Sequence, residues 1–219
     1  MAGRRESAGG HVLQRQMGPR KRQAALRPRR VASPPRRYGS YPRLICQGGF
    51  SIKTLILNGS PRKNGDCAAL LSEFQKHLEG DVRVFSSYYD GISPCIDCRY
   101  CKTHAGCAVN DPMQEVYDCL ATYDNVVLAS PVHYSELSGS LLGMLSRLQT
   151  YFCQRHFRKE TPNLPRKNGV LILAGAQKGT EERARSTANI LFREMNVTPV
   201  AFVFSGNTDF VPAAADKEA

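Results

Sequence analysis

The 219-residue sequence contains no tryptophan, and it has no apolar run of the roughly 18 to 20 residues that a helix needs to cross a bilayer. Its N-terminus also lacks the apolar core, about 7 to 15 residues long, that marks a secretory signal. The absence of a membrane-spanning run and of a secretory signal predicts a soluble, cytoplasmic protein with no membrane partner. The length suits one ordinary domain and is short for two.

Acidic residues are almost absent from the first fifty positions. Residues 1–50 contain twelve Lys or Arg and a single acidic residue, Glu6, which leaves eighteen residues of each sign for residues 51–219. The formal net charge of +11 therefore belongs to the N-terminal segment. Because the rest of the chain is neutral, charge argues against nucleic acid as a partner of the folded domain.

Residues 1–48 are rich in Arg, Pro, Gly and Ser and have neither a helical nor a strand period. Such a segment buries too little apolar surface to offset the entropy of ordering it, so we predict a disordered basic N-terminal extension. Three interpretations of its role stay open. It is a transit peptide, a basic arm that binds nucleic acid, or an extension without a function.

From Lys53 onward, short apolar runs alternate with apolar residues at helical spacing. The runs predict strands at residues 54–57, 81–85, 126–129, 170–173 and 200–204. Between them, one helix is marked by Asp111 as its N-cap and Pro112 at its first position. The apolar stripes of the four helices are Cys67, Leu71, Phe74 and Leu78; Met113, Val116, Tyr117 and Leu120; Leu141, Leu145, Leu148 and Phe152; and Ala184, Ala188, Leu191 and Met195.

This alternation predicts an α/β domain with a parallel sheet covered on both faces. In such folds ligands bind at the carboxyl ends of the strands. The last strand lacks the helix that should follow it, because residues 212–219 read as the opening of a helix that is cut off. We therefore expect that the chain is truncated or that a partner covers the exposed patch.

The loop after the first strand, residues 58–65, has the sequence Asn-Gly-Ser-Pro-Arg-Lys-Asn-Gly and opens a helix. A helix N-terminus presents unpaired N–H groups and a partial positive charge, which attract anions. Gly59 and Gly65 allow close backbone approach, Ser60 adds a hydroxyl, and Arg62 can pair with phosphate oxygens. The loop is not a Walker A motif. It is an anion site or simply a polar turn at a helix start.

Two further loops follow predicted strands. In residues 130–135, Pro131, His133 and Tyr134 can form the wall that a planar ring requires, although His133 alone is a weak signal. In residues 175–179, Gly175 and its small neighbours leave room for a ligand, as do many glycine turns after strands.

Four of the eight cysteines lie within thirteen residues, in the spacing Cys95-x2-Cys98-x2-Cys101-x5-Cys107. Such closely spaced thiolates can bind a cubane iron–sulfur cluster. Zinc is the alternative metal, although its usual spacing is two separated pairs. A cysteine-rich loop without metal is the third interpretation. Cys46 and Cys153 have no such spacing, and Cys67 and Cys119 lie on helix stripes and are expected to be buried apolar residues.

Residues 53 to 212 resemble the NADPH-dependent FMN reductase branch of the flavodoxin-like superfamily, and within it the iron–sulfur flavoproteins. The resemblance rests on residues 59–65, on the cysteine spacing, and on Ser-Pro-Val-His-Tyr at 130–134. It implies a doubly wound five-stranded parallel sheet in the order 2-1-3-4-5, and an FMN-binding domain over residues 49–219 with a cysteine-rich loop at 91–110.

The same resemblance implies the roles of single residues. Ser60, Arg62 and Asn64 would hold the FMN phosphate, and Pro131, Val132, His133 and Tyr134 would lie against the isoalloxazine ring. Cys95, Cys98, Cys101 and Cys107 would hold a [4Fe–4S] cluster. One position departs from the family pattern: Cys67, preceded by Asp66, stands where the family often has a hydroxyl residue, which removes a donor for the phosphate.

The implied function is an FMN-dependent oxidoreductase that takes electrons from NAD(P)H and passes them to a redox partner or a small-molecule acceptor. No protein acid–base residue is expected, because the flavin carries the chemistry. By analogy with the family, the chain is expected to form a homodimer or homotetramer. Two alternatives stay open: an electron carrier without a substrate of its own, and a metal-stabilised interaction module whose basic arm binds nucleic acid.

Overall fold

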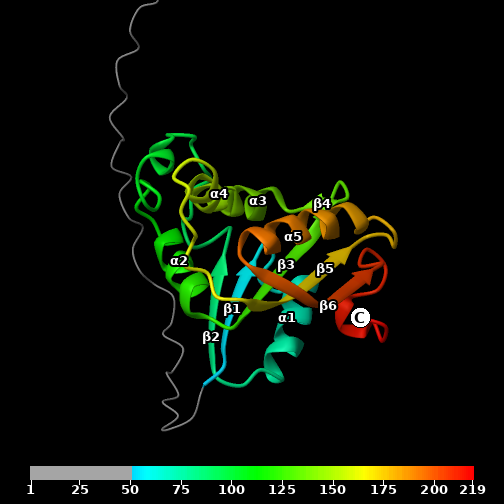
Figure 1. Cartoon of the computed structure of the whole chain (residues 1–219). Helices are drawn as coiled ribbons and strands as arrows, with labels where there is room; N and C mark the ends of the chain where they lie inside the picture. Colours follow the sequence, from blue (N-terminus) through cyan, green and yellow to red (C-terminus); the bar gives the residue numbers. More distant parts are fainter. Residues whose placement is uncertain (1–50) are drawn as a thin grey trace, which may run out of the picture. The chain divides into compact units, whose positions relative to one another are not determined.

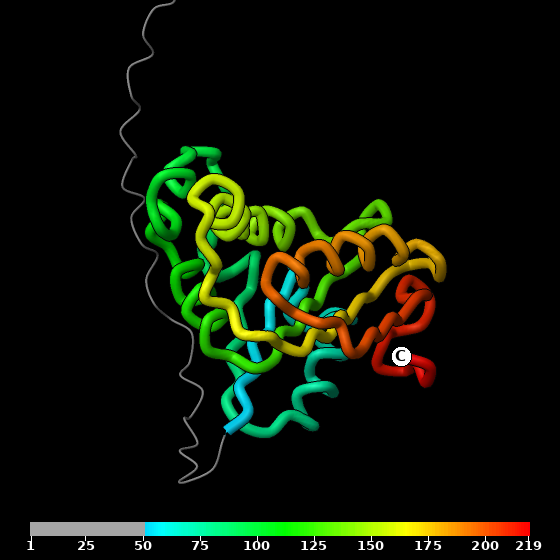
Figure 2. Tube along the Cα trace, viewed as in Figure 1, coloured from blue at the N-terminus to red at the C-terminus, as the bar shows by residue number. Residues whose placement is uncertain are grey.

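The computed structural model describes residues 51–219, so the predictions for residues 1–48 and for Cys46 lie outside the described residues. Figures 1 and 2 show the course of the chain. Its elements are β1 (Lys53–Asn58), α1 (Asp66–Lys76), β2 (Asp81–Ser86), η1 (Tyr100–Lys102), α2 (Met113–Thr122), β3 (Asn125–His133), β4 (Glu136–Leu137), α3 (Gly139–Leu145), η2 (Ser146–Leu148), α4 (Gln149–His156), β5 (Lys167–Gly175), α5 (Glu182–Glu194), β6 (Val197–Gly206) and η3 (Ala213–Ala215), where η marks a 3-10 helix.

The main sheet has the strand order β2-β1-β3-β5-β6, and all of these strands run parallel. This confirms the predicted doubly wound, flavodoxin-like α/β fold, with five parallel strands in the order 2-1-3-4-5. The short strand β4, which pairs antiparallel with the end of β3, was not predicted. None of the helices in residues 51–219 has the length and apolar character needed to span a membrane.

The side chains of the central strands alternate between two apolar cores. Leu55 and Leu57 of β1 join the larger core, which α2, α3 and α5 cover, whereas Ile56 joins a smaller core against Leu71 of α1. Figure 1 shows α1 on one face of the sheet and the other labelled helices on the opposite face. This alternation is why an uninterrupted apolar run correctly indicated a strand buried on both faces.

The edge strand β6 is the least covered part of the sheet. Val200 retains 59% of its side-chain exposure, and the only helical turn that follows β6 within the described residues is η3. η3 packs beside α1 through the buried Ala213. The structure therefore agrees with the expectation that no full helix follows the last strand in residues 207–219.

Two local predictions were wrong. Residues 130–133 were predicted as a loop, but they continue β3 because they pair with β5 and then with β4. Phe152 was placed on a buried helix stripe, but it is exposed at 37%. The predicted helix is divided into α3, η2 and α4, and on α4 the buried residues are Thr150 and Cys153 rather than Phe152.

Lys167 is buried at the start of β5, where its ammonium donates a hydrogen bond of 2.7 Å to the Pro165 carbonyl. Burial lowers the pKa of Lys167 from 10.5 to about 8. Between these two values the unfolded chain holds a proton that the folded chain has released, so the free energy of unfolding should rise with pH across this window. Denaturant titrations from pH 7 to 10 should show this rise in the wild type. The variant Lys167→Met should lack this rise in the free energy of unfolding. If the free energies of unfolding of the two proteins changed with pH in the same way, the prediction would be wrong.

Candidate functional site

The loops after β1, β3 and β5 meet at the carboxyl edge of the sheet, because parallel strands end on the same side. The Gly59 N–H donates to the Ala129 carbonyl at 2.7 Å, which joins the first of these loops to β3. The Thr208 N–H donates to the Gly175 carbonyl at 3.0 Å, which places the segment after β6 beside the loop after β5. The predicted ligand-binding loops thus share one edge.

The loop after β1 is held in shape by its own polar groups. The Asn58 side chain accepts a hydrogen bond from the Ser60 N–H at 2.9 Å, and the buried Ser60 hydroxyl accepts one from the Arg62 N–H at 3.3 Å. The Arg62 side chain is 69% exposed, so its guanidinium faces solvent at the mouth of the loop, and Asn64 is exposed as well. Gly65 precedes α1, whose first N–H groups have no partner within the helix.

Asp66 occupies the first position of α1 and makes two contacts away from the helix. One carboxylate oxygen pairs with the Arg62 guanidinium at 3.0 Å, and the other accepts the Ala213 N–H at 3.1 Å. Asp66 therefore ties the segment after β6 to the loop after β1 and partly neutralises Arg62. Burial, with Asp66 as a second cause, raises the pKa of the Cys67 thiol to about 12, so Cys67 is a buried, protonated residue as expected.

The start of α3 closes against the loop after β1. Ser138 caps α3 by accepting the Leu141 N–H at 3.3 Å, and its own N–H donates to the buried Ser130 hydroxyl at 2.9 Å. A Cβ atom on Gly59 would lie 2.8 Å from both the Ser138 Oγ and the Leu141 Cβ. Glycine at position 59 is thus required by the close approach of helix and loop.

The β3–β4 hairpin carries the predicted ring-binding residues. Pro131 and Val132 are half-buried, whereas His133 is exposed and Tyr134 is fully exposed at the tip. Tyr134 and Ser135 have φ values of 52° and 62°, which are uncommon for residues other than glycine. At the base of the hairpin, Glu136 accepts a hydrogen bond of 2.8 Å from Thr187 of α5.

Gly175, at the end of β5, lies against the same hairpin. A Cβ atom there would come within 3.2 Å of the Val132 Cβ and 3.3 Å of the Phe204 ring. The structure therefore brings Gly175 and Val132 together.

Sequence reasoning missed two residues in the loop after β2. The buried Ser87 hydroxyl has no hydrogen-bond partner among the described residues, while the Ser87 N–H donates to the Asn58 carbonyl at 2.9 Å. The Tyr89 hydroxyl hydrogen-bonds the Pro61 carbonyl of the loop after β1. The rule that ligands bind at carboxyl strand ends applies equally to β2 and would have directed attention to this loop.

The cysteine-rich loop between β2 and α2 is fastened at both ends by Arg147 of η2. This fully buried guanidinium donates to the Ser93 carbonyl at 3.1 Å, to the Val109 carbonyl at 3.1 Å and to the Asp111 carboxylate at 2.8 Å. Asp111 also accepts a hydrogen bond of 3.1 Å from the Met113 N–H, and α2 begins at Met113, one residue later than predicted. Buried charges persist when they are paired in this way.

The middle of the same loop is fixed by Arg158, which follows α4. Its guanidinium donates to the carbonyls of Cys101 at 2.5 Å and His104 at 3.0 Å. The Cys95 N–H donates to the Ser146 hydroxyl at 2.9 Å. The backbone of the loop is thus held by side chains from other elements, and its thiols are left to line a pocket.

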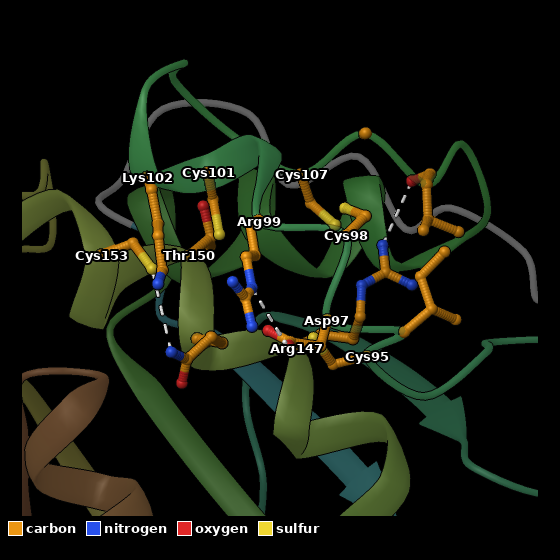
Figure 3. Close-up of a pocket in the computed structure, with 14 residues that line it drawn as sticks. Cys95, Asp97, Cys98, Arg99, Cys101, Lys102, Cys107, Arg147, Thr150 and Cys153 are labelled. Carbon is orange, nitrogen blue, oxygen red and sulfur yellow. Dashed lines mark hydrogen bonds and ion pairs between the residues drawn. The ribbon is translucent and has the colours of Figure 1, made fainter. Parts of the chain in front are cut away.

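All four spaced cysteines line this pocket, shown in Figure 3, and a fifth, Cys153, enters it from α4. Burial raises the pKa of Cys101 to about 11, and hydrogen bonding to the Cys153 thiol and the proximity of Cys107 add to the rise. Within residues 51–219 no three His, Cys, Asp or Glu side chains are arranged so that they could hold a single metal ion. The four thiols share one pocket without forming such a cage.

The sheet order, with the loops after β1, β3 and β5 at one edge of the sheet, defines a flavodoxin-like α/β protein. A family model described as NADPH-dependent FMN reductase matches residues 52–209. The chain belongs to this family.

The chain also resembles relatives of known name in sequence and solved structures in fold. The chain is 30% identical to an iron-sulfur flavoprotein of Methanocaldococcus jannaschii over 68% of this chain and 75% of that protein. It is 27% identical to an iron-sulfur flavoprotein of Archaeoglobus fulgidus over 69% of this chain and 67% of that one. An NAD(P)H:quinone oxidoreductase from Methanothermobacter marburgensis shares the fold, with a TM-score of 0.55 and 16% identity over 74% of this chain and 87% of that one.

Proposed function

We propose that this protein is an FMN-dependent oxidoreductase whose flavin binds at the carboxyl edge of the sheet. The observation that carries the proposal is the convergence there of the loop after β1 with the start of α3 and the end of β3. Gly59 permits this approach, and the buried, unpartnered Ser87 hydroxyl among the described residues adds a polar group that a ligand can satisfy.

Each part of the edge has a role in this proposal. Ser60, Arg62, Asn64 and the N–H groups that follow Gly65 bind the phosphate, since an α-helix N-terminus favours anions. Pro131, Val132, His133 and Tyr134 line the ring. Gly175 allows Val132 of the hairpin and the Phe204 ring to pack closely against the end of β5. All of them belong to one FMN-binding domain over residues 49–219.

When bound, FMN supplies hydride and single-electron transfer. The protein binds the phosphate, orients the ring against the hairpin and admits an electron donor, which we propose is NAD(P)H. The acceptor is a small molecule or a redox partner. No residue is assigned as a general acid or base, and His133 is exposed on the hairpin rather than held in a buried proton relay.

We further propose that Cys95, Cys98, Cys101 and Cys107 hold a [4Fe–4S] cluster. Four thiols that line one pocket are the donor set that such a cluster uses, and the names of the relatives point to the same group. Anaerobic purification followed by iron, sulfide, zinc and flavin analysis tests both cofactors on one sample. Flavin without iron or sulfide would reject the cluster and leave the FMN proposal intact.

The phosphate assignment predicts the behaviour of Arg62→Gln. A charge-assisted contact with phosphate is worth about 1.5–3 kcal/mol, so FMN should bind about 10- to 150-fold more weakly to the variant. Riboflavin, which lacks the phosphate, should bind both proteins equally. Titrations that follow the quenching of flavin fluorescence measure both affinities. An equal loss for FMN and riboflavin would place Arg62 outside the phosphate site.

Steady-state oxidation of NADH and NADPH separates the enzyme from the second candidate, an electron carrier. The enzyme turns over repeatedly with a quinone or free flavin as acceptor, whereas a carrier does not oxidise either nucleotide at a sustained rate.

The same preparation, analysed by light scattering, tests the predicted homodimer or homotetramer, which would bury part of the exposed face of β6.

A further inference from the structure

The first half of β6 and the neighbouring helix α5 form an open groove of about 470 Å³. Figure 1 shows α5 over the sheet beside β6, the last strand at this edge. The apolar lining of the groove includes Leu171 of β5 and Val197 and Phe202 of β6. Within residues 51–219 no strand pairs with the outer side of β6, so the groove is open to solvent along the edge of the sheet.

Three polar side chains of α5 follow the groove. Arg185, Asn189 and Arg193 are spaced every four residues, so they lie on one face of the helix, and all three are exposed and line the groove. The Arg185 guanidinium lies over the Phe202 ring, 4.6 Å from its centroid, which holds this cation above the apolar lining. The groove therefore has a cation at each end and an amide between them.

Neither arginine of the groove has an acidic partner. No Asp or Glu lines the groove, and no ion pair among the described residues includes Arg185 or Arg193. Glu194, which follows Arg193 in the chain, is paired with Arg155 at 2.6 Å instead. Since the protein supplies no counter-charge here, a ligand that brings carboxylates would complement the groove.

The spacing of the two arginines selects an extended ligand. Arg185 and Arg193 are eight residues apart, which is a rise of about 12 Å along an α-helix, and four residues of an extended chain rise about 13 Å. Residues four apart in an extended chain point to the same side, and so does the residue midway between them. That midway residue would meet the apolar lining. Pro199 has no N–H, so hydrogen bonds along β6 would be interrupted, and the arginines and the apolar lining must provide the recognition.

We propose that the groove between α5 and β6 binds an extended acidic segment of a partner protein, in which two carboxylates four residues apart flank a central apolar residue. The carboxylates pair with Arg185 and Arg193, and the central side chain packs on Phe202. The groove follows the first half of β6, whereas the proposed flavin site lies at the carboxyl ends of the strands. The partner therefore leaves the flavin site open, and the proposal rests on neither FMN nor the cluster.

Two fluorescein-labelled peptides of equal composition test the spacing against the full chain. Thr-Glu-Thr-Val-Thr-Glu-Thr places its carboxylates four residues apart, and Thr-Glu-Thr-Val-Glu-Thr-Thr places them three apart, on opposite sides of an extended chain. Fluorescence anisotropy should show that the second peptide binds about 2- to 5-fold more weakly, the effect of one exposed ion pair. Equal affinities would overturn the proposal, because both spacings share a face in a helix and carry the same charge. So would the absence of binding of the first peptide at up to about 1 mM protein.

Variants of exposed arginines test the two ends of the groove. Arg185→Gln and Arg193→Gln should each weaken binding of the first peptide about 2- to 5-fold. The double variant should weaken it about 4- to 25-fold, since sites this far apart act independently. The control is Arg183→Gln, because Arg183 is also exposed on α5 but does not line the groove. Equal losses in the three single variants, or no loss in either groove variant, would reject the proposal.

A second copy of this chain is the competing occupant of the groove. Light scattering should give the same particle mass for the wild type, for the double variant and for the wild type with the first peptide. A lower mass in the double variant or with the peptide would assign the groove to self-association and overturn the proposal. Flavin content should be the same in the wild type and in every arginine variant of the groove. A failure of the FMN proposal would leave the peptide affinities unchanged, so the two proposals fail separately.

Discussion

Replacing Arg147 by methionine is expected to lower the free energy of unfolding by about 3–5 kcal/mol, the loss typical of a buried ion pair that is deprived of one partner. Methionine has a similar volume but no donor. The variant would therefore leave the Asp111 carboxylate and the carbonyls of Ser93 and Val109 without the guanidinium that satisfies them. Urea titrations of both proteins, followed by circular dichroism, measure the difference.

The matched control is Arg83→Met. Arg83 also forms an ion pair, with Glu115 at 2.8 Å, but both side chains are about half exposed or more. An exposed pair of this kind contributes roughly 0–1 kcal/mol. If both variants lost a similar free energy of unfolding, the burial of Arg147 and its three contacts with the loop would not explain its contribution to stability.

Gly59→Ala is expected to destabilise the protein by about 1–3 kcal/mol, as overpacked sites do. The added methyl group would lie 2.8 Å from the Leu141 Cβ and the Ser138 Oγ, so α3 and the loop after β1 must separate. That separation changes the proposed phosphate site, and FMN should bind more weakly as well. Denaturation and flavin titration measure the two effects.

Gly139→Ala provides the control for this change. Gly139 is the first residue of α3, and a Cβ atom there would meet no described atom within 4 Å. Alanine favours helix over glycine by up to about 1 kcal/mol, so this variant should be as stable as the wild type or more so. If Gly59→Ala lowered neither the free energy of unfolding nor the affinity for FMN, the close packing of α3 against the loop after β1 would not be what requires glycine at position 59.

The sheet could be predicted from sequence because its signal is local. The runs at 54–57 and 126–129 are short and almost wholly apolar, which is typical of a strand buried on both faces. The hairpin at residues 130–137 could not be predicted in the same way. Its turn uses Tyr134 and Ser135 at positive φ, where glycine or asparagine usually marks a turn, so the sequence shows no turn signal there.

The site could be predicted only in part for a related reason. The loop after β1 and the cysteine spacing are contiguous, so their chemistry is visible in the sequence. Arg147 binds the cysteine-rich loop, and Cys153 lines the same pocket, from elements that follow the loop by tens of residues. From sequence alone, a single arginine in an otherwise apolar helix stripe is predicted to face solvent, because its hydrogen-bond partners lie elsewhere in the chain. Contacts of this long range are set by the fold rather than by any local pattern.

The two-ended attachment of the cysteine-rich loop also bears on how its length can change. Arg147 contacts Ser93 at one end of the loop and Val109 and Asp111 at the other. These contacts fix the distance between the two ends of the loop. For a flexible closed loop, doubling the number of residues adds only about 0.6 kcal/mol of closure entropy. Insertions placed between the contacts that Arg158 and Ser146 make with this loop should therefore cost the fold little, so loops of different length can be accommodated on the same scaffold.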